Sequence, residues 1–267
     1  MLDNFLPEQW LSGVLEGMRL PSTFVQPQDS YGRAQENLKQ AYNPDMGLHH
    51  PFLTQLFYAF NSAPFLRWLE GLTGIGGLLP DPYFHGGGVH ITPTGGHLFI
   101  HADFNIHKHL SLLRRLNLLV FLNEEWQEEW GGHLELWSAD MQHCERKILP
   151  RLNRAVLFDT TDRSFHGQPD PLRCPPSVRR LSLALYYYTA SAHIFQEHRS
   201  HTTQFQVRPG SGDQVDWNVK VREWVEDWLP PILRRKLASW RRKPSAGGYG
   251  HSSTEPLDTD SSSAVSS

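Results

Sequence analysis

Cysteine is nearly absent from this chain. Only Cys144 and Cys174 occur among the 267 residues, and they form no CxxC pair. The sequence therefore offers neither a disulfide framework nor the paired thiols of a zinc knuckle, which is typical of proteins from a reducing compartment. The first residues are acidic where a secretion signal would be basic, so we expect a cytoplasmic protein.

The chain also lacks a strong charge of either sign. Its formal net charge is −3, and charged residues make up 20% of it. This balance gives no general attraction to nucleic acid or to an anionic membrane, and no run of about eighteen apolar residues predicts a membrane span. We expect a protein that binds neither. Histidine and tryptophan are abundant instead, with 15 and 9 copies, which suits a pocket.

Four segments within the first eighty residues have the features of helices. Their apolar residues recur at helical spacing, and turn residues open or precede each segment. The predicted helices span residues 5–18, 33–42, 51–60 and 63–72. We therefore interpret residues 1–80 as a helical N-terminal support that packs on the rest of the protein.

Short segments rich in β-branched and aromatic residues follow, separated by Gly, Pro, Asn or Asp. The predicted strands are 84–92, 98–102, 114–123, 132–138, 153–159 and 178–189. Six strands at this spacing favour an antiparallel sandwich or barrel. The expected fold class is mainly β with flanking helices, and residues 81–195 form its core.

Two further regions complete the predicted organisation. Residues 196–243 form a C-terminal extension, in which the Trp-rich stripe of residues 216–243 predicts an amphipathic helix. We expect this helix to pack on the core or to mediate a homodimer, with a role at a membrane or a partner as the alternative. Residues 244–267 are rich in Ser and Gly and have little to bury, which predicts a disordered tail.

The stretch FIHADFNIHKHL, residues 99–110, places His101 and Asp103 two residues apart at the end of a predicted strand. Side chains at positions i and i+2 of a strand point to the same face, so the imidazole and the carboxylate can converge on one metal ion. His166 follows another apolar strand, and antiparallel pairing could place it opposite them. Two histidines and one carboxylate leave coordination positions open, as in non-haem Fe(II) oxygenases.

The last predicted strand supplies a cation for an acidic cosubstrate. A 2-oxo acid can fill two open positions on the metal, and its far carboxylate then needs a buried positive partner, for which arginine is well suited. If the leucines of RRLSLALYYYT face one way, Arg180 and Ser182 face the other and point into the site, while Arg179 points outward.

Residues 88–189 resemble the 2-oxoglutarate- and Fe(II)-dependent oxygenases of the prolyl 4-hydroxylase-like group. The resemblance rests on the HAD motif at 101–103, on RRLNLLVFLNEEW followed by GGHLELW, on His166 after a strand, and on RLSLALYYY from residue 180. It implies a double-stranded β-helix, or jelly-roll, core. It also implies that His101, Asp103 and His166 bind iron and that Arg180 binds the C5 carboxylate of 2-oxoglutarate.

Two features depart from that family pattern. The segment between His166 and Arg180 is longer than in many relatives and rich in proline. Some relatives also hold 2-oxoglutarate with a tyrosine on the middle strand, where this chain has Phe121. Asn117, on the same predicted face of that strand, is our candidate for the missing polar contact.

Four other residues near the motif deserve an interpretation. His90 and Trp137 are candidates for the substrate pocket, although a role in the core is an equally good reading of each. His107 and His109 lie just after the metal motif. Because three protein ligands already suffice, we expect these two histidines on a solvated face or at the mouth of the pocket.

The resemblance implies a dioxygenase that uses Fe(II), 2-oxoglutarate and O₂, hydroxylates an unactivated C–H bond and releases succinate and CO₂. We expect a small-molecule substrate, such as an amino acid or a biosynthetic intermediate, with peptidyl-prolyl hydroxylation as the alternative. Two rivals are a non-catalytic jelly-roll protein that binds a ligand and a zinc hydrolase with the same ligands. The first would have lost a ligand or the basic anchor, and the second would have no use for a buried Arg180.

Overall fold

The computed structural model describes residues 1–24, 31–32, 36–45, 48–107, 109–190 and 201–213. All of them lie in one compact unit, Met1–Trp217. The predicted amphipathic helix at 216–243 and the predicted tail at 244–267 lie outside the described residues. None of the described helices has the length and apolar character that crossing a bilayer requires.

Helices are concentrated before residue 75, and strands dominate the rest. The helices are α1 (Glu8–Arg19), α2 (Pro51–Phe60) and α3 (Ala63–Thr73), with two short 3₁₀ turns, η1 (Pro21–Thr23) and η2 (Glu128–Trp130). The strands are β1 (Tyr31–Gly32), β2 (Glu36–Tyr42), β3 (Leu78–Pro80), β4 (Gly88–Pro93), β5 (His97–Ala102), β6 (Leu113–Phe121), β7 (Leu134–Trp137), β8 (Cys144–Ile148), β9 (Arg154–Asp159), β10 (His166–Gln168), β11 (Arg179–Thr189) and β12 (Gln204–Phe205).

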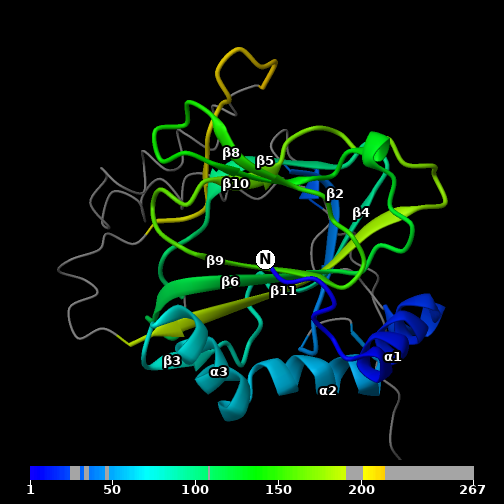
Figure 1. Cartoon of the computed structure of the whole chain (residues 1–267), viewed down its shortest axis with the longest axis vertical. Coiled ribbons are helices and arrows are strands. Elements are labelled where there is room, and N and C mark those ends of the chain that lie inside the picture. The colour runs from blue at the N-terminus through cyan, green and yellow to red at the C-terminus, as the bar shows by residue number, and fades with distance from the viewer. Residues whose placement is uncertain (25–30, 33–35, 46–47, 108, 191–200, 214–267) are drawn as a thin grey trace, which may run out of the picture. The chain divides into compact units, whose positions relative to one another are not determined.

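The strands form one antiparallel sheet of twelve strands that curls into two facing layers (Figure 1). The order along the sheet is β8-β7-β10-β5-β2-β4-β11-β6-β9. One layer contains β8, β10 and β5, and the other contains β11, β6 and β9. Strand β2 joins the layers because it pairs with β5 near its start and with β4 near its end. This is the jelly-roll core that the sequence predicted.

The three helices cover the outer face of the layer that contains β11 and β6 (Figure 1). Alternate residues of these strands point outward into the main hydrophobic core, where Leu118 and Leu183 pack with Leu53, Phe57 and Leu69 of the helices. Each buried side chain of this size contributes about 1.5–3 kcal/mol. The other face of each strand is thereby left to line the space between the layers, so the helices fix which residues reach the interior.

The structure corrects the sequence prediction in the region before residue 80. Residues 33–42 were predicted to be helical, but 36–42 form strand β2. The composition of this segment favours a helix, with Ala, Gln, Glu, Leu and Lys, yet pairing with β4 and β5 overrides that preference. The N-terminal region is therefore a helical support that also contributes a strand to the core.

All six predicted strands and the other three predicted helices are present, with ends shifted by a few residues. The strands that the prediction missed are short or lie at the margins of the sheet. They are β1, β3, β8, β10 and β12. Two to five residues carry too little alternation to be recognised from sequence.

Gly88 should be essential for joining β4 to β2. Its φ angle is +124°, and a Cβ atom there would overlap the carbonyl oxygen of Tyr42 in the neighbouring strand. We expect Gly88→Ala to lower the free energy of unfolding by about 3 kcal/mol or more. Gly71→Ala is the matched control, since that position is helical and open and should be stabilised slightly. Equal urea midpoints for both variants would contradict this account.

Candidate metal and cosubstrate site

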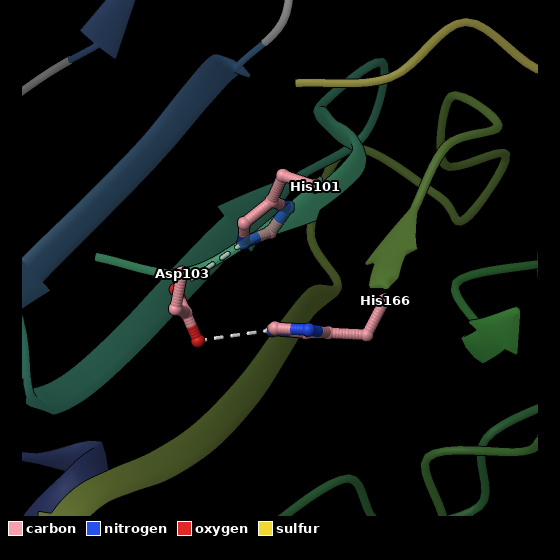
Figure 2. A group of neighbouring side chains, drawn as sticks. All are labelled: His101, Asp103 and His166. Atoms are coloured by element: carbon pink, nitrogen blue, oxygen red, sulfur yellow. Dashed lines mark ion pairs between the residues drawn. The ribbon is translucent and has the colours of Figure 1, made fainter. Parts of the chain in front are cut away.

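The structure brings His101, Asp103 and His166 together in the space between the layers. His101 lies near the end of β5, Asp103 follows that strand, and His166 begins β10 directly opposite His101. All three are buried, and their potential ligand atoms lie within 4.8 Å of one another. Figure 2 shows the two imidazoles and the carboxylate directed toward a common point. The antiparallel pairing of β5 and β10 is therefore what assembles the group.

Backbone carbonyls fix the orientation of both imidazole rings. Nδ1 of His101 donates to the carbonyl oxygen of Phe99 at 2.8 Å, and Nδ1 of His166 donates to that of Ser164 at 2.9 Å. Because a carbonyl can only accept, each Nδ1 carries a proton, and Nε2 is the nitrogen left to bind a metal ion. Burial lowers the pKa of His166, although Asp103 opposes this effect. The neutral ring is the form that binds a metal ion.

Asp103 is ionised despite being buried. Burial alone would raise its pKa, but Arg114, His166 and His101 together hold it well below its usual value. Its Oδ1 lies 3.5 Å from Nε2 of His101, and its Oδ2 lies 3.3 Å from Nε2 of His166. Oδ2 also accepts a hydrogen bond from Nδ2 of Asn117 at 2.7 Å and lies 3.0 Å from Nη2 of Arg114. The carboxylate is thus held in one orientation toward the histidines.

Arg114 is the main residue of this site that sequence reasoning missed. It is fully buried, and its guanidinium lies 3.5 Å from the ring centre of Tyr186 and 4.6 Å from that of Phe104. Strict alternation along β6 would put Arg114 and Asn117 on opposite faces. A bulge changes this, because Tyr187 pairs with Leu116 while Tyr188 pairs with Arg114. The extra residue turns Arg114 toward the interior, and no pattern in the sequence predicts this bulge.

Asn117 has different partners from those expected of it. It lines the same cavity as the metal group, but its side-chain amide is already engaged. Its Oδ1 accepts two hydrogen bonds from Arg114, at 2.9 and 2.6 Å, and one from Thr160 at 3.2 Å, while its nitrogen donates to Asp103. This network orients the carboxylate with the amide oxygen and one of the two amide hydrogens, and the contact of Asn117 with 2-oxoglutarate stays a prediction.

Arg180 occupies the same cavity, a space of about 90 Å³ between the layers. Its Nε donates to the carbonyl oxygen of Gly132 at 2.8 Å, and its guanidinium lies 5.0 Å from the ring centre of Phe121. Gly132 has φ +74°, and a side chain there would crowd Arg180. Burial lowers the pKa of Arg180 to about 10, so it stays charged at neutral pH. Among the described residues, no carboxylate lies within ion-pair distance of it.

Ser182 and His90 also line this cavity, as predicted from the faces of their strands, and Arg179 is exposed. Nε2 of His90 donates to the carbonyl oxygen of Gly86 at 3.1 Å. The pKa of His90 is well below its usual value because the ring is buried and because Lys39 lies nearby. His90 is therefore an uncharged residue of the cavity lining.

Trp137 does not reach the cavity. On β7, Leu134 lines it, so Trp137 lies on the opposite face of the strand. There it packs with Ile100, Ala102 and Phe165 and donates to Glu135 at 3.0 Å. Period-two alternation, applied from Leu134, would have excluded Trp137 from the pocket.

One of the two histidines after the motif differs from expectation. His107 is completely buried rather than solvated, and its Nε2 donates to Asp81 at 3.2 Å. Its Nδ1 accepts from the backbone N–H groups of His109 and Leu110. Both ring nitrogens are used, so His107 is a structural residue. His109 is exposed, as expected.

Comparisons with known proteins agree with this geometry. Residues 87–188 match the family model described as the 2OG-Fe(II) oxygenase superfamily. Prolyl 3-hydroxylase OGFOD1 of Mus musculus is 29% identical to this chain over 83 residues, which are 29% of this chain and 15% of the mouse protein. The chain thus spans only a small part of that relative's length.

Two solved structures are similar to this chain. A prolyl hydroxylase from Trichoplax adhaerens, in complex with a peptide fragment of the hypoxia inducible factor oxygen degradation domain, has a TM-score of 0.51 and 18% identity and covers 74% of this chain and 86% of its own. A Pseudomonas putida prolyl-4-hydroxylase has a TM-score of 0.47 and 19% identity, with coverages of 71% and 91%. The first match supports the jelly-roll assignment.

The ion pair between Arg114 and Asp103 yields a stability prediction. Arg114→Met should lower the free energy of unfolding of the metal-free protein at neutral pH by roughly 3–5 kcal/mol, because it leaves a buried carboxylate unpaired. The deficit should shrink as the pH falls, since protonation of Asp103 removes the unpaired charge. Arg67→Met, at an exposed helical position, is the control and should change stability by less than about 0.5 kcal/mol. Urea denaturation at two pH values measures both effects, and a deficit independent of pH would count against this pairing.

Proposed function

We propose that this protein is an Fe(II)- and 2-oxoglutarate-dependent hydroxylase, because residues 87–188 match the family model of the 2OG-Fe(II) oxygenase superfamily. One observation carries the proposal. A complete group of two imidazoles and a carboxylate shares a cavity with a buried arginine that has no carboxylate partner among the described residues. The first feature suits a divalent iron ion, and the second suits an organic acid.

The donor set fits the metal of this family. Nε2 of His101, Nε2 of His166 and an oxygen of Asp103 would hold Fe(II), and ligand atoms within 4.8 Å of one another need only small shifts to lie about 2.0–2.2 Å from a shared ion. When bound, Fe(II) supplies the activation of O₂ that couples oxidation of 2-oxoglutarate to succinate and CO₂ with hydroxylation of a substrate. The protein supplies position and charge.

The cavity residues have separate tasks in this proposal. Arg180 binds the C5 carboxylate of 2-oxoglutarate through its Nη groups, because its Nε is committed to Gly132, and Ser182 lies on the same face of β11. Arg114 and Asn117 keep the Asp103 carboxylate oriented before the metal arrives. The layers and helices exclude water, which strengthens each of these charged contacts.

For the substrate, we favour a prolyl residue of a peptide. The similarity to a prolyl 3-hydroxylase over 83 residues supports this choice. A second cavity of about 600 Å³, lined by Asn105, Arg114 and Thr160 among others, supports it further, because Arg114 connects this cavity to Asp103. A small molecule, as the sequence led us to expect, is the alternative occupant.

The first test concerns the cosubstrate. Arg180→Met should weaken binding of 2-oxoglutarate by roughly 30-fold or more, because a buried charge pair is lost, while the bound iron content stays unchanged. Arg179→Met is the matched control, since the neighbouring side chain is exposed. Anaerobic addition of Fe(II) and 2-oxoglutarate, followed by the weak visible charge-transfer band of the chelate, measures the binding. Absence of the band in folded, iron-loaded wild type would reject the proposed function.

The second test concerns the substrate. Proline-containing peptides should stimulate O₂-dependent release of succinate by the iron-loaded protein, and mass spectrometry should find a gain of one oxygen on proline. The same peptides with alanine in place of proline are the control and should give only background release. Stimulation by free amino acids or other small molecules, with no response to any peptide of a proline-containing library, would overturn the peptide assignment and favour the alternative.

A further inference from the structure

We propose that Lys39 is a second anchor for the C5 carboxylate of 2-oxoglutarate, acting with Arg180 from another strand of the same sheet face. The inference rests on the proposed function and adds to it a residue from the N-terminal region. Lys39 lies on β2, the strand that the sequence analysis took for a helix. Its side chain is half-buried and lines the same cavity as Arg180 and the metal group.

The register of three neighbouring strands puts the two cations on one face. Arg180 on β11 is opposite Thr92 on β4, and Ser182 is opposite His90. Ala41 on β2 is opposite His90 from the other side. Lys39 is two residues from Ala41 and therefore shares its face of the sheet. Both Lys39 and Arg180 lie close enough to His90 for their charges to lower its pKa.

The demand for a second donor comes from the carboxylate itself. An ionised carboxylate has two oxygens and about four acceptor positions, and a buried one is stable only when most of them are satisfied. Arg180 offers only its Nη groups, because its Nε donates to Gly132. Phe121, whose ring faces the guanidinium, has no donor to add, and Asn117 already donates one of its two amide hydrogens to Asp103.

The charged side chains that line the cavity also support a second anchor. Asp103 is the single carboxylate among the described residues that line this cavity, and Arg114 already pairs with it. Lys39 and Arg180 are the formally positive side chains of the lining. The two positive side chains therefore complement the two negative charges of 2-oxoglutarate. The lysine ammonium, on its long flexible side chain, can reach the carboxylate without requiring one fixed geometry.

The test is the dissociation constant of 2-oxoglutarate, measured by anaerobic calorimetry on iron-loaded protein. Lys39→Met should raise it about tenfold, as expected for loss of a charge-assisted hydrogen bond. Lys39→Arg should restore most of the affinity. Lys147→Met is the matched control, because this lysine is half-exposed, lies outside the cavity lining and pairs with Glu135. Thermal unfolding of each variant establishes that it is folded.

A second ligand separates anchoring from a general effect on the site. 2-Oxopentanoate has a methyl group in place of the C5 carboxylate, so its affinity should be the same in wild type and Lys39→Met. An equal loss for both ligands, or wild-type affinity for 2-oxoglutarate in folded Lys39→Met, would overturn the role of Lys39 while leaving the proposed function standing if Arg180→Met still loses binding. No binding of 2-oxoglutarate by wild type would overturn both.

Discussion

A buried carboxylate must be compensated by positive charge, and the centre of this barrel is organised around that need at Asp103. Without a metal ion the compensation comes from Arg114, supported by Asn117 and by the two histidines. The arrangement keeps the carboxylate ionised and fixed, which is the state that binds a cation. The two oxygens of the Asp103 carboxylate have unequal numbers of contacts, because Asn117 and Arg114 both contact Oδ2. Oδ1 has only His101 beside it.

The interior positions depend on irregularities in the strands as well as on their regular alternation. In β6, the bulge at residue 115 brings Arg114 to the same side as Asn117. In β5, the register with β10 moves from Leu98 opposite Gln168 to His101 opposite His166, so residues 99 and 100 face the single residue 167, and both ends of the segment reach the cavity. Each extra residue re-aims a side chain at the site, a use of bulges common beside active sites.

The sequence was informative wherever a pattern was local. The HxD motif, the distal His166 and the alternation of β11 placed the metal group and Arg180, and the predicted strands proved correct because they were long and apolar. Three kinds of feature stayed hidden. A helix-forming composition concealed β2, and a bulge concealed Arg114. The burial of His107 was concealed because its hydrogen-bond partner Asp81 is far away in the sequence. Each depends on contacts between residues far apart in the chain, which no window of sequence contains.

The remaining question is why the fold tolerates Arg180. Burial lowers its pKa to about 10, so the charged form is roughly 3 kcal/mol less favoured there than in water, and no carboxylate among the described residues offsets this. A methionine would fill the same space at lower cost. A bound organic acid offsets this penalty, because its carboxylate attracts the charge of the guanidinium. The unfavourable burial of the Arg180 charge in the free protein therefore strengthens the binding of an acid. This effect is strongest for a carboxylate that fits between Arg180 and a second cation.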